Sequence, residues 1–147
     1  MAIRVAHIAT GNVGRLALGE LIENPAFALT GLCVSTPEKV GKDAGELAGV
    51  DIATGITATD DLEAVLATEP ECAVYCAMGD TRMPDAMRAV GRILAAGINV
   101  VGSAPGILQF PWQVIPDRYI EPLELAARQG NSSIYINGVD PGFITDL

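Results

Sequence analysis

Short apolar segments alternate with amphipathic segments along the whole chain. The first apolar run covers 3–8, and a helical pattern follows over 13–23, ending where Asn24 precedes a proline. Further short runs with strand character cover 29–34, 56–58, 73–77, 99–102 and 134–137. Because strands separated by helices pair in parallel through right-handed crossovers, the pattern predicts an α/β fold. We expect a doubly wound, mostly parallel sheet with helices on both faces.

Helical signals separate the later strands as well. Asp60 lies three residues before Glu63, the spacing of a capping box, and this predicts a helix that Asp60 caps. A second helix has Pro84 near its first position and Gly97 just past its end. A third helix is predicted over 122–129, because a proline opens this segment and a glycine follows it.

The segment between the first strand and the first helix carries a glycine pattern. Its sequence over 9–15 matches the dinucleotide fingerprint G-x-G-x-x-G at Gly11 and Gly14, with Ala9 at the first glycine position. Gly11 lets a pyrophosphate approach the backbone, and Gly14 lets the helix pack close to the strand. The helix N-terminus adds free N–H groups and a positive dipole end. The pattern predicts a Rossmann-type nucleotide site, provided that Ala9 needs no positive φ; a tight turn without a ligand is the alternative.

The choice of cofactor depends on the loop after the second strand. An acidic residue at that strand end would accept from a ribose 2′-hydroxyl, and this chain has none there. The loop offers the hydroxyls of Ser35 and Thr36, Lys39 and Lys42 are nearby, and Arg15 stands on the first helix. These residues favour NADP(H) over NAD(H), whereas Glu38 argues against that preference and an ordinary solvated loop is the alternative for both lysines.

Composition excludes several other functions. Aspartate and glutamate number 18 against 9 lysines and arginines, a formal net charge of −9, which argues against nucleic-acid binding. Cys33, Cys72 and Cys76, with a single histidine, fit neither a disulfide framework nor a metal site, and they predict reduced, buried thiols in a cytoplasmic protein. The uncharged stretch over 93–116 contains too many glycines and prolines for a membrane span, so we expect a strand and a buried loop.

Several single residues allow two interpretations each, one structural and one functional. His7, the one histidine, is expected to be a packed strand residue rather than a catalyst. Asp140 precedes Pro-Gly, which is first a turn signal and second a possible catalytic acid. Trp112 and Phe110 either line a substrate cavity or pack their own loop.

Four segments resemble one known family. The sequences ATGNVGR (9–15), STPEKVGKDAGELAG (35–49), GSAPG (102–106) and NGVDPGF (137–143) resemble the dihydrodipicolinate reductase-like superfamily. They are most similar to its branch of NAD(P)H-dependent amine and 2,4-diaminopentanoate dehydrogenases. The resemblance covers the whole chain, and it implies that this chain is the nucleotide-binding domain of such an enzyme.

The resemblance also implies positions for the cofactor. The residues that would bind its pyrophosphate are Gly11, Asn12, Val13 and Gly14. Those near the adenosine ribose would be Ser35, Thr36 and Lys39, and those near the nicotinamide would be Ala77, Met78, Gly79, Ser103, Ala104 and Asn137.

In that family a second domain supplies much of the substrate pocket and the dimer interface. We therefore expect the dinucleotide-binding domain to cover 1–147 and a substrate domain to follow it, which this sequence does not include. A homo-oligomer is expected, because the strand over 134–137 also leaves a sheet edge unpaired.

One departure from the family concerns proton transfer. The Pro111-Trp112 pair of the amine dehydrogenases is present, but the preceding stretch over 106–110 has no carboxylate to act as a general base. The catalytic residue therefore stays unassigned, and amine oxidation is in doubt. The predicted function is hydride transfer between NADP(H) and an imine, amine or related small carbonyl substrate. A nucleotide-binding module without turnover is the alternative.

Overall fold

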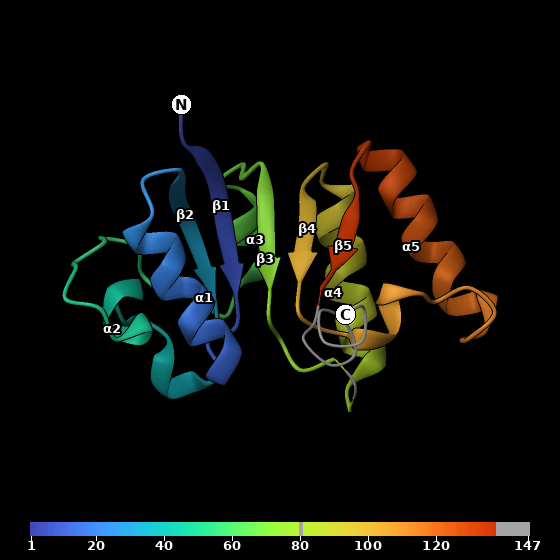
Figure 1. The fold of residues 1–147 in the computed structure, drawn as a ribbon, viewed down its shortest axis with the longest axis horizontal. Coiled ribbons are helices and arrows are strands. Elements are labelled where there is room, and N and C mark those ends of the chain that lie inside the picture. Colours follow the sequence, from blue (N-terminus) through green and yellow to red (C-terminus); the bar gives the residue numbers. More distant parts are fainter. Residues whose placement is uncertain (80, 138–147) are drawn as a thin grey trace, which may run out of the picture. The chain divides into compact units, whose positions relative to one another are not determined.

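The computed structural model describes residues 1–79 and 81–137. The chain forms two compact units, Met1–Cys76 and Ala77–Leu147. Each unit combines parallel strands with helices (Figure 1). The α/β class predicted from the alternating pattern is therefore confirmed.

The first unit is built on three parallel strands in the order β2-β1-β3. They are β1 (Ile3–Ile8), β2 (Phe27–Cys33) and β3 (Cys72–Tyr75). Ile8 is paired with Cys33 on one side and with Tyr75 on the other, so the three strands end at the same level. The loops that follow them consequently share one edge, which is where open α/β sheets bind ligands.

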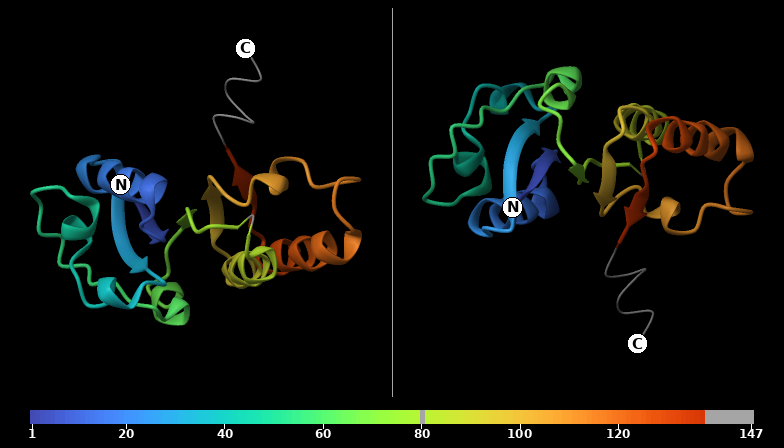
Figure 2. Two further views of the ribbon diagram at one scale, coloured as in Figure 1. Left: turned by 90° about the horizontal axis from the view of Figure 1, so that it is seen from below. Right: turned by 90° about the horizontal axis from the view of Figure 1, so that it is seen from above.

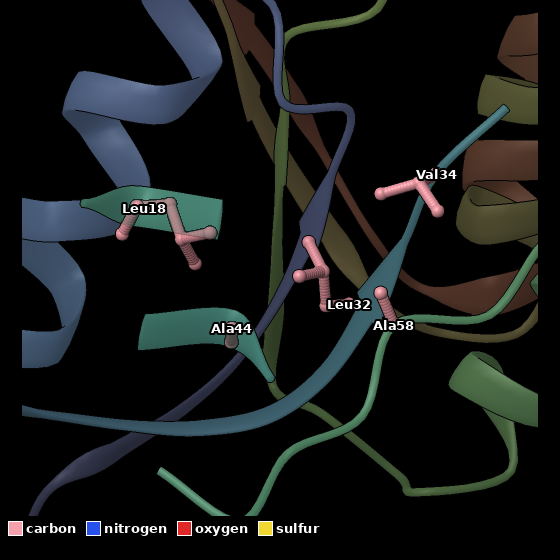
Figure 3. Close-up of a cluster of buried hydrophobic side chains, with 6 residues drawn as sticks. Leu18, Leu32, Val34, Ala44 and Ala58 are labelled. Atoms are coloured by element: carbon pink, nitrogen blue, oxygen red, sulfur yellow. The ribbon is translucent and has the colours of Figure 1, made fainter. Parts of the chain in front are cut away.

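Helices lie on both faces of these three strands. They are α1 (Asn12–Glu23), α2 (Ala44–Ala48) and α3 (Leu62–Leu66), together with the 3₁₀ turn η1 (Pro37–Lys39). Figure 2 shows α1 and α3 on opposite sides of β2. One buried cluster joins helix to sheet (Figure 3), and its members are Leu18, Leu32, Val34, Ala44, Ala48 and Ala58.

The second unit has two parallel strands and two long helices. The strands are β4 (Asn99–Gly102) and β5 (Ile134–Ile136), and the helices are α4 (Met83–Ala95) and α5 (Asp117–Gly130), with a 3₁₀ turn η2 (Gly106–Gln109). The two helices pack side by side (Figure 2), and Val90, Ile93 and Leu94 of α4 are fully buried. None of the helices in the described part of the chain has the length and hydrophobicity that crossing a bilayer requires.

The predicted third strand over 56–58 is wrong. Only isolated bridges form there, between Thr57 and Asp43 and between Thr59 and Cys33. Thr59 exchanges backbone hydrogen bonds with the second strand, through Leu32 O at 3.0 Å and Val34 N at 2.8 Å. The segment is thus held at single points, and its apolar run is too short to form a ladder.

Two predicted helix starts are also wrong. The cap of α3 is Asp61 rather than Asp60, because the Asp61 Oδ1 accepts from the backbone N–H groups of Glu63 and Ala64 at 2.9 and 3.3 Å. Helix α5 begins at Asp117, five residues before the proline expected to open it, so Pro122 lies inside the helix. A proline one turn into a helix removes one backbone hydrogen bond, and the acidic residue in the first turn favours the earlier start.

Candidate functional site

The loop after β1 has the geometry of a dinucleotide fingerprint. Gly11 caps α1 with φ −71°, and the first helical hydrogen bond runs from Arg15 N to Gly11 O at 2.8 Å. A Cβ added at Gly11 would meet no described heavy atom within 4 Å. The backbone in front of the helix is therefore open to a ligand, as the fingerprint requires of its second glycine.

Gly14 has the opposite surroundings. A Cβ at this position would lie 2.2 Å from the carbonyl oxygen of Ala9 and 3.1 Å from the Cβ of Cys76. Only glycine lets α1 approach the strand end this closely, which is the task of the third fingerprint glycine. The two glycines thus differ as the sequence pattern predicts.

Ala9 occupies the first glycine position at φ +74°. The nucleotide site was predicted on the condition that the turn at Ala9 needs no positive φ. That condition is not met. A left-handed conformation costs a residue with a Cβ roughly 1–2 kcal/mol. The turn keeps its shape despite the alanine, so neighbouring groups must hold it.

The N-terminus of α1 is left available to an anion. Its cap makes no side-chain hydrogen bond, and the described first turn holds no acidic residue. Asn12 and Val13 are both exposed there. Free N–H groups and the positive end of the helix dipole suit a phosphate at this point.

Lys39 is brought to the same loop from η1. Its Nζ donates to the carbonyl oxygen of Thr10 at 2.7 Å and to the Thr10 hydroxyl at 3.0 Å. Ser35 and Thr36 are exposed in the loop between β2 and Lys39. These three residues, predicted near the adenosine ribose, therefore share one edge with the fingerprint loop.

Arg15 points to a neighbouring helix. Its Nη1 donates to Ala48 O, the last residue of α2, at 3.3 Å. That helix is anchored at its other end by Asp43, which accepts from the N–H groups of Thr54, Gly45 and Gly55. These hydrogen bonds hold the pKa of the Asp43 carboxyl below its ordinary value.

His7 is buried beneath the loop, as expected of a packed strand residue. The exposed fraction of its side chain is 0%, and its Nε2 lies 2.8 Å from Ala9 O. Burial lowers the pKa of His7 to about 4, against the opposing effect of the adjacent backbone of Ala9 and Gly14. The imidazole is consequently neutral at neutral pH.

Two loops of the second unit carry the residues expected near a nicotinamide. Gly79 and Pro105 connect them, because a Cβ on Gly79 would lie 2.5 Å from the Cγ of the fully buried Pro105. Met78 is 71% exposed and Ser103 is also exposed, whereas Ala77 and Ala104 are half-buried. The structure thus places the 77–79 loop against the 103–106 loop.

The remaining predicted residues lie at the end of β5 and beyond. Asn137 is exposed, and its backbone N–H donates to Gly102 O at 2.8 Å. Asp140 lies outside the described residues. No group of three or more His, Cys, Asp and Glu side chains in the described part of the chain could hold a metal ion. The three cysteines are half-buried, so they are less buried than predicted.

Phe110 and Trp112 are largely exposed, at 67% and 51%. The rings of Phe110 and Trp112 meet edge to face with centroids 5.8 Å apart. The Trp112 Nε1 donates to Glu124 of α5 at 3.0 Å, and Glu124 also pairs with Arg128 at 3.2 Å. The two interpretations of Trp112, a wall of a substrate cavity and packing of its loop, both stay predictions.

Comparison with known proteins adds to this geometry. No family model matches the chain. The chain is 41% identical over 138 residues to an amine dehydrogenase from Streptomyces virginiae, covering 94% of this chain and 38% of that protein. The chain is therefore a relative of the amine dehydrogenases. A second relative, 39% identical over 59 residues, is a 4-hydroxy-tetrahydrodipicolinate reductase from Mastigocladus laminosus, with 40% of this chain and 21% of the reductase covered. The resemblance inferred from the four motifs is thus confirmed.

Solved structures show the same fold. An amine dehydrogenase from Mycobacterium smegmatis superposes with a TM-score of 0.84 at 24% identity, over 94% of this chain and 40% of that one. A biliverdin reductase from Synechocystis sp. PCC 6803, solved with biliverdin and NADP⁺, has a TM-score of 0.65 at 13% identity, over 92% and 37%. GenD2 from gentamicin A biosynthesis, solved with NAD, has a TM-score of 0.62 at 20% identity, over 93% and 34%. The chain spans about two fifths of the amine dehydrogenases it matches.

Sequence reasoning missed two residues of this site. The sequence marks Thr10 only as a variable position of the fingerprint. In the structure its carbonyl oxygen and its hydroxyl both accept hydrogen bonds from the Lys39 ammonium. Pro105 was seen as a loop residue, yet Gly79 packs against its ring. Neither contact has a local sequence signal, because the partners are far apart along the chain.

Proposed function

We propose that this chain is the dinucleotide-binding domain of an NAD(P)-dependent oxidoreductase of the amine dehydrogenase type, covering 1–147. The observation that carries the proposal is the pairing of an open Gly11 with a Gly14 whose Cβ would collide with Ala9 O. A simple tight turn has no need of either property. Together they match what bound pyrophosphate and a closely packed helix require.

The residues present fit a nicotinamide dinucleotide. Gly11 to Gly14 would hold its pyrophosphate through backbone N–H groups, and Ser35, Thr36 and Lys39 would face its adenosine ribose. When bound, the cofactor supplies hydride transfer. The 77–79 and 103–106 loops, with Asn137, would orient the nicotinamide and exclude water from it.

NADP(H) is the preferred cofactor in this proposal. The Lys39 ammonium lies at the fingerprint loop, where it can also meet a ribose 2′-phosphate, and no acidic side chain ends β2. Related folds have been solved with either NADP⁺ or NAD, so the preference rests on this chain's own residues.

The substrate is proposed to be a small amine or imine, or a related carbonyl compound, because a relative is an amine dehydrogenase. A substrate domain outside 1–147 is expected to supply the substrate pocket and the proton donor. The stretch over 106–110 contains no carboxylate that could act as one. We further propose that the protein is cytoplasmic, since its three cysteines fit no disulfide framework, and that it is a homo-oligomer, since the edge strand β5 exposes Tyr135.

Calorimetric titration with NADPH, NADH and 2′,5′-ADP tests the cofactor proposal. We expect NADPH to bind more tightly than NADH, and 2′,5′-ADP to retain much of the NADPH affinity through the phosphates. Quenching of Trp112 fluorescence provides an independent signal. The absence of both heat and quenching would refute the proposal.

Turnover is tested separately with NADPH and a panel of cyclic imines and ketones. We expect binding with little or no NADPH oxidation by this chain, because it lacks a proton donor at the described loops. Rapid oxidation would show that the chain carries its own catalytic residue. Binding without turnover, even in a longer chain of this protein, would favour the nucleotide-binding module instead.

A further inference from the structure

His7 makes a single hydrogen bond from a fully buried position. Its Nε2 lies 2.8 Å from Ala9 O, and its Nδ1 has no hydrogen-bond partner among the described residues. An unpaired polar atom in a buried site is unfavourable, and an apolar side chain would avoid that penalty. The histidine therefore has to be explained by the hydrogen bond that it does make.

The bond defines the state of the ring. A carbonyl oxygen can only accept, so Nε2 carries the proton and Nδ1 carries the lone pair. The lowered pKa of about 4 keeps the ring in this neutral form at neutral pH. His7 thus acts as a fixed N–H donor to the backbone two residues further along the chain.

The accepting residue is the one with a strained backbone. Ala9 has φ +74°, a conformation that an alanine does not hold by itself. Its N–H donates to Cys33 O at 2.8 Å, and its carbonyl accepts from His7, so both polar groups of Ala9 are tied down. The same carbonyl lies against Gly14, where a Cβ would come within 2.2 Å.

We infer that His7 is a positioning residue for the nucleotide site: by holding the Ala9 carbonyl, it fixes the left-handed turn that places the N-terminus of α1 in front of the phosphates. The inference rests on the proposed function. His7 itself would touch no cofactor. It allows an alanine to stand where the fingerprint has its first glycine.

The test compares NADPH binding in five versions of the full chain. They are the unchanged chain, His7→Leu, His7→Gln, His7→Leu combined with Ala9→Gly, and Val5→Ala as a control in the same strand. We expect His7→Leu to weaken NADPH binding about tenfold, the equivalent of one lost hydrogen bond. His7→Gln should stay within about threefold, because a Gln amide N–H can donate to the same carbonyl.

The double variant separates positioning from packing. Glycine adopts a positive φ without strain, so Ala9→Gly should restore the NADPH affinity that His7→Leu loses. Val5 is buried at 2% exposure, and Val5→Ala should lower the melting temperature while leaving the affinity unchanged. If His7→Leu binds NADPH as well as the unchanged chain, or if Ala9→Gly restores nothing, the inference is wrong.

A second readout needs no nucleotide. Amide hydrogen exchange at 10–14 should be faster in His7→Leu than in the unchanged chain, and Val5→Ala should not change it selectively. Failure of the unchanged chain to bind NADPH would refute the proposed function, whereas this exchange would still decide whether His7 holds the loop. Equal exchange in both chains would overturn the inference.

Discussion

The ammonium group of Lys39 contacts Thr10 twice, at 2.7 Å from the carbonyl oxygen and 3.0 Å from the hydroxyl. This contact joins the loop after β2 to the fingerprint loop after β1. It places a cation beside the region where the second strand of a dinucleotide-binding fold reads the ribose. Under the proposed preference for NADP(H), the residue that chooses the cofactor would also support the loop.

Replacing Lys39 should change the cofactor preference. We expect Lys39→Met to weaken NADPH binding about tenfold, because a charge-assisted hydrogen bond to phosphate is lost. NADH binding should weaken by less than about threefold, because NADH has no 2′-phosphate and only the loss of the Lys39–Thr10 hydrogen bonds would affect it. Calorimetric titration with both nucleotides measures the two effects.

Lys42 provides the matched control. It lies three residues away and forms an exposed ion pair with Glu46 at 2.8 Å. Lys42→Met should therefore leave both affinities nearly unchanged. Equal losses of NADPH and NADH binding in Lys39→Met would contradict a role for Lys39 in choosing the cofactor.

The two fingerprint glycines should respond differently to alanine. In Gly14→Ala the new Cβ would collide with Ala9 O, so we expect a loss of about 1–3 kcal/mol in the free energy of unfolding. Gly11→Ala has open space and an ordinary φ of −71°, so its stability should stay within about 0.5 kcal/mol. Its NADPH affinity should nevertheless fall, because the Cβ obstructs the approach of the pyrophosphate.

Urea denaturation and NADPH titration of both variants separate these effects. A stable Gly14→Ala chain would contradict the close approach of α1 to the strand end. An unchanged NADPH affinity in Gly11→Ala would mean that phosphates do not approach the backbone at this position.

Ala9→Gly should stabilise the chain. It removes a strained positive φ, a gain that exceeds the backbone entropy of the added glycine, and the net effect should be about 0.5–1 kcal/mol. Ala6→Gly is the control: Ala6 is fully buried within β1, and the same change there should destabilise the chain. Thermal melts of both variants give the comparison, and a destabilised Ala9→Gly would show that the turn carries no strain.

Much of the fold could be predicted because its signals are local. The run over 3–8, the glycine turn and the helix that ends before Pro25 each follow from adjacent residues, and the structure has β1 and α1 there. The same holds for β4 and for α4 with its proline near the start. A very short apolar run such as 56–58 could not be judged locally, because its pairing depends on what lies beside it.

Sequence alone named Gly11, Gly14 and Lys39 as candidate cofactor residues, since fingerprint spacing and residue type are visible in it. Their role toward a cofactor stays a prediction. The positive φ of Ala9 was left undecided, because a backbone angle is set by contacts that arise only in the folded chain. His7 was expected to be a packed residue, and its bond to Ala9 O adds a role that burial alone does not suggest.

His7 should make the stability of the chain depend on pH. Its pKa is about 4 in the folded chain, where burial disfavours the charged ring, and its ordinary value of 6.5 applies when the chain is unfolded. Between pH 6.5 and 4 the unfolded chain therefore binds more protons at this residue than the folded chain does. The contribution of His7 to the free energy of unfolding is fully present above pH 6.5. It is lost as the pH falls toward 4, a change of roughly 3 kcal/mol.

The His7→Gln variant isolates this effect, because the carboxylates titrate in both chains and cancel in the difference. Urea denaturation at pH 7.0, 6.0, 5.0 and 4.5 should show the unchanged chain losing stability faster than His7→Gln as the pH falls. The two chains should differ by a constant amount above pH 7, where His7 is neutral in both states. Parallel pH profiles from pH 7 to 4.5 would mean that His7 titrates alike in the folded and unfolded chains, and hence that the ring is not held as a neutral donor to Ala9.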